Sequence, residues 1–150
     1  MDFQKFKSAR NHMPTLHLVC DEMELKPGDR KIITAGKRSI GVFNVKGEFF
    51  AILNICPHQL APLAEGQVKG FCPPGPVGHF SYEREGEIIR CPWHGWEFDI
   101  KTGKSIFNPH KVKTASYPVR VQETEHFSET EKSVETFRTQ IVNRQIFVEA

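Results

Sequence analysis

Two short segments of the chain carry cysteine and histidine at spacings suited to binding a metal. In the first, one residue separates Cys56 from His58, and in the second, two residues separate Cys91 from His94. Each cysteine is followed by a proline, which disfavours a helix at the cysteine and removes one backbone donor. In extended chain, residues i and i+2 point the same way, so Cys56 and His58 are expected to face one centre. A turn brings residues i and i+3 together, which suits Cys91 and His94.

Two thiolates and two imidazoles on facing loops have two main uses. Zinc accepts two cysteines and two histidines tetrahedrally, commonly with gaps of two to four residues between paired ligands. A [2Fe–2S] cluster can also take two cysteines and two histidines, with both histidines on one iron. The spacing alone leaves both possibilities open. Cys20 and Cys72 have no comparable setting and are expected to be unliganded thiols.

Short extended runs separated by glycine-containing turns surround both pairs. Strands are expected where β-branched or alternating residues lie between turn signals, at 15–20, 30–34, 39–45, 49–55, 86–90, 96–100, 114–121 and 145–150. Two of these runs lead directly into Cys56 and Cys91. No segment shows a sustained helical period, although 130–142 is ambiguous. The pattern therefore predicts an antiparallel, all-β domain.

Two segments depart from this pattern. Residues 72–78, at the start of a longer insert over 72–87, are too rich in proline and glycine for a regular element. Residues 123–135 contain five glutamates and one lysine. We expect this acidic stretch to be a solvated loop or a short exposed helix, with a patch for docking a partner as the alternative.

Length and composition limit the class of protein. A chain of 150 residues with 39% hydrophobic and 25% charged residues is typical of one soluble globular domain. The net charge of +2 gives no general reason to expect binding to nucleic acid or to an anionic membrane. No apolar run approaches the ~18 residues of a membrane helix, and the first residues lack the apolar stretch of a secretory signal. We therefore expect a cytoplasmic protein without a disulfide framework.

The sequences around the two pairs separate the metal alternatives. The segments CPHQLAPLAEG, at 56–66, and CPWHGWEFDIKTGK, at 91–104, resemble the two cluster-binding loops of the Rieske family, specifically its soluble, oxygenase-associated branch. The resemblance extends from about residue 28 through 120. It implies one [2Fe–2S] cluster of the Rieske type, with Cys56 and Cys91 holding the inner iron and His58 and His94 the outer iron.

The resemblance also implies a fold and a domain organisation. Residues 1–150 would form a single Rieske domain, in which a small cluster-binding subdomain, at approximately 54–108, is inserted in a base like a β-sandwich or barrel. Compared with membrane-anchored respiratory members, Ala61 and Trp93 stand where a disulfide would be, so no bridge is expected. Trp96 and Phe98 stand where a serine and a tyrosine would donate to cluster sulfurs. Without those donors, we expect a reduction potential at the low end of the Rieske range, about −150 mV.

The implied function is one-electron transfer. Rieske oxygenases carry a second domain with a mononuclear iron, and this chain has no room for one, so it is not expected to be an enzyme by itself. The leading hypothesis is a Rieske-type ferredoxin that carries electrons from a flavin reductase to a terminal oxygenase or a similar acceptor. Partners would approach His58 and His94, with Trp93 as the candidate docking residue. The alternatives are a permanent small subunit of a redox enzyme, like the nitrite-reductase small subunit, and a zinc-stabilised structural module.

Overall fold

The described part of the chain is almost entirely β-structure. The structure is a computed structural model that describes residues 14–79, 81–129 and 138–150. The strands, in chain order, are β1 (Leu16–Asp21), β2 (Arg30–Ala35), β3 (Arg38–Val45), β4 (Glu48–Leu53), β5 (Gln67–Phe71), β6 (Glu83–Arg90), β7 (Glu97–Asp99), β8 (Ser116–Tyr117), β9 (Val119–Glu129) and β10 (Arg138–Glu149). Two single-turn 3-10 helices, η1 (Glu22–Glu24) and η2 (Leu63–Glu65), join them. The expected antiparallel, all-β fold is confirmed.

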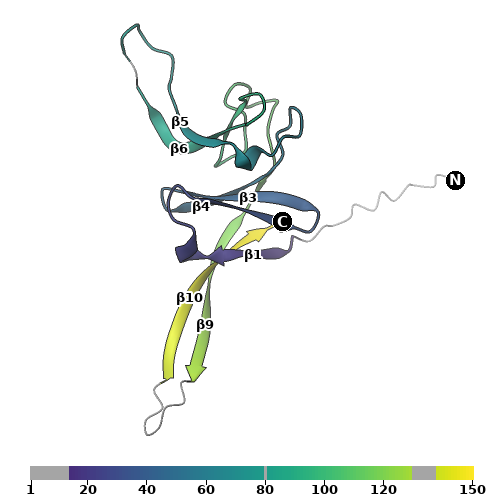
Figure 1. Cartoon of the computed structure of the whole chain (residues 1–150), viewed down its shortest axis with the longest axis vertical. Coiled ribbons are helices and arrows are strands. Elements are labelled where there is room, and N and C mark those ends of the chain that lie inside the picture. The colour runs from purple at the N-terminus through teal and green to yellow at the C-terminus, as the bar shows by residue number, and fades with distance from the viewer. Residues whose placement is uncertain (1–13, 80, 130–137) are drawn as a thin grey trace, which may run out of the picture.

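Three antiparallel sheets follow one another along the molecule. Their strand orders are β1-β10-β9, β2-β3-β4-β8 and β5-β6-β7. Figure 1 shows the β5–β6 hairpin at one end of the long axis, β3 and β4 in the middle, and the β9–β10 hairpin projecting from the other end. The first two sheets make the base of the molecule, and the third sheet lies between β4 and β8 in the chain.

The central sheet separates two hydrophobic cores. Along β3, Ile40 and Val42 face a core shared with β1 and β10, whereas Phe43 and Val45 face a core shared with the third sheet. This alternation follows from the two-residue period of a strand, and burial on both faces explains why β3 is a nearly continuous apolar run. The second core contains Cys56 and Cys91, so the two cysteine loops pack directly on the base.

The two irregular segments behave differently. Residues 72–78 contain no strand or helix, as their proline and glycine content predicts. The expectation of a loop or short helix for 123–135 is wrong for 123–129, which belong to β9 and pair with β10 as far as Glu129 opposite Arg138. The paired residues of β10 lie 9 to 21 positions away in sequence, so local charge content did not reveal the pairing. Residues 130–135 lie outside the described residues.

The described helices are both single 3-10 turns. None of them is long or apolar enough to cross a membrane.

Candidate metal centre

The first cysteine loop connects β4 to η2. The Cys56 N–H donates to the carbonyl oxygen of Ala61 at 2.8 Å, and the Leu60 N–H donates to that of Cys56 at 2.8 Å. These two bonds close a tight loop in which Leu60 adopts the left-handed conformation, with φ of 61°. Leu60 is 73% exposed, so no packing of its side chain offsets the strain of this conformation.

The second cysteine loop repeats this backbone. The Cys91 N–H donates to the carbonyl oxygen of Trp96 at 2.7 Å, and the Gly95 N–H donates to that of Cys91 at 3.0 Å. Gly95 occupies the left-handed position, with φ of 74°. Each loop thus has its cysteine at the first position, a left-handed residue at the fifth and a closing carbonyl at the sixth. The two segments, 35 positions apart in sequence, present their cysteines in equivalent settings.

This loop geometry corrects one expectation. The segment that contains Cys56 and His58 is not extended, because residues 57–59 form a turn. Cys56 is buried while His58 is exposed, so the i, i+2 rule for extended chain does not describe this pair. The expected turn between Cys91 and His94 is confirmed, and there too the cysteine is buried and the histidine exposed.

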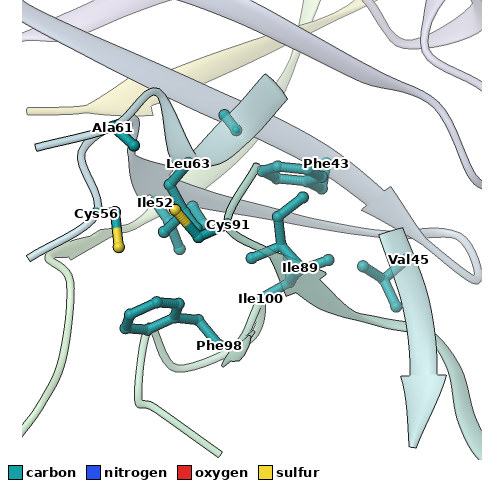
Figure 2. Close-up of a cluster of buried hydrophobic side chains, with 11 residues drawn as sticks. Phe43, Val45, Ile52, Cys56, Ala61, Leu63, Ile89, Cys91, Phe98 and Ile100 are labelled. Carbon is teal, nitrogen blue, oxygen red and sulfur yellow. The ribbon is translucent and has the colours of Figure 1, made fainter. Parts of the chain in front are cut away.

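The two thiols lie together inside the protein. Cys56 is 1% exposed and Cys91 is 3% exposed, and Figure 2 shows both side chains in the same buried cluster as Phe98 and Ile52. Burial raises the pKa of the Cys56 thiol, and the neighbouring Cys91 thiol raises it further. Backbone amides of the loop that donate to the Cys56 sulfur lower the pKa and so oppose this rise. Because metals bind the thiolate, a cation here would compensate for the burial of negative charge.

The two imidazoles lie together at the surface. The ring centroids of His58 and His94 are 4.8 Å apart, with an angle of 80° between the ring planes. His58 also stacks on the indole of Trp96, with centroids 4.1 Å apart and an interplanar angle of 12°. Trp96 therefore orients one of the two predicted histidine ligands, a role that sequence reasoning did not assign to it.

The four predicted ligands form two pairs of like donors rather than one converging set. Across residues 14–79, 81–129 and 138–150, no three His, Cys, Asp or Glu side chains come together closely enough to hold one ion. A tetrahedral zinc site needs four donors around one point. A two-iron cluster of the mixed type takes two thiolates on one iron and two imidazoles on the other. The buried thiol pair and the exposed imidazole pair fit the second arrangement.

A buried asparagine braces the first loop. The side-chain carbonyl oxygen of Asn54 accepts the Ala64 N–H at 2.7 Å, and its amide nitrogen donates to the Ser39 hydroxyl at 3.1 Å. Asn54 thereby fixes both ends of the segment that contains Cys56 to strand β3. Sequence reasoning missed this residue, because an asparagine after a strand is an ordinary turn signal.

A threonine that follows the third sheet in the chain, just before β8, also holds the first loop. The buried hydroxyl of Thr114 lies 3.3 Å from the carbonyl oxygen of Leu53 and 3.1 Å from that of Ile55, to which it can donate. These two carbonyls immediately precede Cys56. The contact joins segments about 60 positions apart, and nothing in the local sequence indicates it.

The second loop is held against the first by a close backbone approach. Gly66 lies so near the carbonyl group of Arg90 that a methyl group on Gly66 would overlap the carbonyl oxygen. The Gly66 carbonyl oxygen in turn accepts a hydrogen bond from the Arg30 guanidinium, which comes from β2. Because Arg90 immediately precedes Cys91, this junction sets where Cys91 lies relative to the first loop.

The remaining residues singled out in the sequence lie apart from the donors. Cys20 is buried in the core of the base, where burial raises the pKa of its thiol, and Cys72 is exposed in the insert. Both are free thiols. Trp93 is 58% exposed at the tip of the second loop, which is the exposure that docking requires. Phe98 is fully buried and offers no donor to the neighbouring cysteines.

The chain is similar to a set of known redox proteins. The family model described as Rieske [2Fe-2S] domain matches residues 15–118. The Ferredoxin CarAc of Metapseudomonas resinovorans is 29% identical over 115 residues, which cover 76% of this chain and 92% of the relative. The structure of a Sphingomonas yanoikuyae B1 ferredoxin is 30% identical, with a TM-score of 0.53, over 72% of this chain and 91% of that one.

A further solved structure shares the fold. It is a complex of reduced oxygenase and oxidized ferredoxin in carbazole 1,9a-dioxygenase; the matched chain has a TM-score of 0.56 and 21% identity, over 89% of this chain and 92% of that chain.

Proposed function

The chain belongs to the Rieske [2Fe-2S] domain family, and we propose that it is the ferredoxin component of an oxygenase-type redox system. It is a one-electron transfer protein that carries a Rieske-type [2Fe–2S] cluster. The similar proteins CarAc and the naphthalene 1,2-dioxygenase ferredoxin of Pseudomonas putida carry names of this kind, and the chain spans 92% and 80% of their lengths.

Cys56, Cys91, His58 and His94 are the proposed cluster ligands. The observation that carries this assignment is where the four donors lie: the two thiols are close together in the core, and the two imidazoles are close together at the surface. The inner iron would take Cys56 and Cys91, and the outer iron would take His58 and His94. The zinc alternative would need all four donors around one ion, an arrangement to which these two pairs are poorly suited.

The bound cluster supplies reversible one-electron chemistry. The residues of the chain bury the two thiolates away from water, and the amides of His58 and Gln59 donate to the Cys56 sulfur. Hydrogen bonds of this kind stabilise negative charge on sulfur and thus affect the potential. The two histidine rings stay at the surface, where a partner can approach them.

The proposed partners are proteins that give and receive one electron. A flavin reductase would reduce the chain, and a terminal oxygenase or similar acceptor would oxidise it. A ferredoxin bound to an oxygenase in the structurally similar carbazole 1,9a-dioxygenase complex supports this order. The cytoplasm is the proposed location, because it keeps Cys56 and Cys91 reduced until iron is bound.

The proposed domain organisation is one Rieske domain over residues 1–150, with a cluster-binding part at approximately 54–108. Its support is that the third sheet and both cysteine loops lie between β4 and β8, which are neighbours in the base. Limited proteolysis of the iron-loaded protein tests this organisation. If the base and the cluster-binding part form one domain, cleavage within the base should also cause loss of the cluster.

Iron and sulfide assays with EPR spectroscopy of the reduced protein test the cofactor and its ligands. We expect two irons and two sulfides per chain, a red-brown colour and the EPR signal of a reduced Rieske cluster. Cys56→Ser should lose the cluster, whereas the matched variant Cys72→Ser, at an exposed free thiol, should keep it. A colourless protein with one zinc, or equal iron in both variants, would overturn the assignment.

A mixture of purified components tests the electron transfer. The reduced protein should support turnover by a terminal oxygenase when a flavin reductase and its reductant are present. Omission of the chain should stop turnover. A protein that retains its cluster but purifies only in a stable complex with a redox enzyme would favour the accessory-subunit hypothesis instead.

A further inference from the structure

An apolar groove of about 630 Å³ opens beside the second cysteine loop. Its apolar lining comes from the end of β5, the second loop and the segment after β7: Phe71, Gly95, Trp96, Ile106, Phe107 and Val112. Phe107 is 97% exposed, so its ring contributes almost nothing to folding. An exposed aromatic ring at the edge of an apolar groove is the surface that an inserted side chain from another protein would use.

A pair of lysines stands next to this groove without acidic partners. Ser105 and Val112, which both line the groove, are joined by a backbone hydrogen bond of 2.9 Å. Lys104 and Lys113, their neighbours in the chain, lie directly opposite each other in an antiparallel bridge, and Lys104 lines a pocket that shares Phe71, Ser105 and Ile106 with the groove. This is a non-hydrogen-bonded pair, in which side chains lie closest, and like charges there repel each other. Within the described residues, neither lysine makes a salt bridge.

The acidic residues around the groove are already neutralised. Glu97, which lines it, binds Lys69 at 2.6 Å. Asp99, in the adjoining pocket that also contains Lys104, binds Arg84 at 2.7 Å.

The surplus charge of this surface is therefore positive. The guanidinium of Arg90, another cation without an acidic partner in the described part of the chain, packs against Gly95 in the groove wall. Together with the lysine pair, it gives the groove a basic rim, and among the described residues no acidic side chain forms a salt bridge with any of these three cations.

The groove is also continuous with the proposed electron-transfer site. Trp96 forms part of its wall and stacks on His58 at 4.1 Å between ring centroids. A side chain inserted into the groove would contact Trp96 and so lie one aromatic ring away from a proposed ligand imidazole. Docking at this position places a partner close to the site without requiring it to displace either histidine.

From these observations we propose that the groove and its basic rim (Trp96, Phe107, Arg90, Lys104 and Lys113) form the docking surface for a redox partner protein with an acidic face. An apolar side chain of that partner occupies the groove, and its carboxylates face the lysine pair. The proposal rests on the proposed function and adds the chemistry of the partner to it. Repulsion between the two lysines is relieved when the acidic face arrives, which favours the bound state.

Small redox reagents of opposite charge test the sign of this surface. The iron-loaded protein is reduced and then mixed, in a stopped-flow instrument, with the anion Fe(III)–EDTA or the cation hexaammineruthenium(III), each of which accepts one electron. Reversal of both charges in Lys104→Glu/Lys113→Glu should slow oxidation by the anion roughly 5- to 10-fold at about 0.01 M ionic strength. Oxidation by the cation should become faster, and both effects should vanish at about 1 M salt.

A matched double variant separates local from overall charge. Lys31→Glu/Lys37→Glu makes the same change in net charge at exposed lysines in β2 and the turn that follows it. Its rates should change less than about twofold. Equal effects in the two double variants, or no effect in either, would overturn the proposal while leaving the electron-transfer function intact. A protein that never takes up iron would overturn the proposed function and this inference with it.

An aromatic anion tests the groove itself. 8-Anilinonaphthalene-1-sulfonate combines apolar rings with one negative charge, and calorimetric titration should show binding that weakens at least fivefold in Phe107→Ser and in Lys104→Glu/Lys113→Glu. Unchanged binding in both variants would contradict the assignment of the groove. Concentration-dependent self-association that Phe107→Ser abolishes would identify a second copy of the chain as the occupant and overturn the proposal of a redox partner.

Discussion

The junction between the two cysteine loops depends on the absence of one methyl group. Gly66 has φ of −72°, which any residue can adopt, so a change to alanine brings no dihedral strain. Its methyl carbon, however, would lie 2.9 Å from the carbonyl carbon of Arg90 and 3.1 Å from the carbonyl oxygen of Leu63, and would overlap the Arg90 oxygen. Both neighbours are backbone atoms and have no alternative rotamer.

The size of the effect of Gly66→Ala follows from these contacts. Carbon atoms pack at about 3.5–4.0 Å, so β5 and β6 must separate by on the order of 1 Å at the Gln67–Arg90 pair. Overpacking of this kind costs about 1–3 kcal/mol, and a weakened ladder hydrogen bond adds about 1 kcal/mol. We expect the free energy of unfolding to fall by about 3 kcal/mol and the Tm to fall by roughly 6–12 °C.

Urea denaturation and iron analysis measure the two consequences of this substitution. Because Arg90 immediately precedes Cys91, Gly66→Ala should also reduce the iron content of the purified protein. The control is Gly75→Ala, where the new methyl would meet only the His79 carbonyl oxygen at an ordinary 3.4 Å. It should change stability by less than about 0.5 kcal/mol. If Gly66→Ala matched this control in both stability and iron content, the argument from the close backbone approach would be wrong.

Three further substitutions address the site and the third sheet. Trp93→Ala should slow electron transfer to a partner with the cluster retained, as measured by stopped-flow absorbance; loss of iron would show instead that Trp93 shields the site. Phe98→Tyr adds a hydroxyl donor beside the buried cysteines. If its hydrogen bond stabilises the reduced state over the oxidised state by about 1 kcal/mol, the reduction potential should rise by roughly 40 mV, as measured by protein-film voltammetry. An unchanged or lower potential would contradict this. The hydrogen bond from Lys101 lowers the pKa of Glu87 below its ordinary 4.5, against the opposing effect of burial. The pKa of Glu87 is lower in the folded chain than in the unfolded chain. The interaction with Lys101 therefore stabilises the fold fully above the unfolded pKa, and this stabilisation is lost as the pH falls through the folded pKa. Glu87→Gln should therefore cost about 1 kcal/mol in urea denaturation at pH 7 and progressively less as the pH falls below 4.5, and a cost that does not change with pH would refute the assignment.

The sequence alone was sufficient for the fold class, the family and the cofactor. Alternating β-branched runs and glycine turns predicted an antiparallel, all-β chain, because the two-residue period of a strand is a local property. The prolines after Cys56 and Cys91 correctly indicated loops rather than helices, since their effect on the preceding residue is also local. The two cysteine–histidine segments, with their flanking residues, indicated the Rieske family before any contact was known.

Local rules failed where geometry depends on a hydrogen bond to a residue outside the pattern. The i, i+2 rule assumed that Cys56 and His58 lie in extended chain, but the bond from Cys56 to Ala61 closes a turn in which Cys56 is buried and His58 is exposed. The acidic stretch suggested a loop or a short helix, but its first residues pair with β10. In both cases the hydrogen bond that sets the conformation joins residues farther apart than the i, i+2 rule or local charge content takes into account.

What the amino-acid sequence determined by itself was the chemistry available: two thiols, two imidazoles, and strands to carry them. What only the tertiary structure decided was their arrangement, with the thiols paired in the core and the imidazoles paired at the surface. It also decided the stacking of Trp96 on His58 and the basic groove beside it. The physical reason is that burial and ring stacking are set by contacts between residues 24 to 59 positions apart, such as Gly66 with Arg90 or Thr114 with Ile55, whereas residue type and strand period are properties of each segment alone.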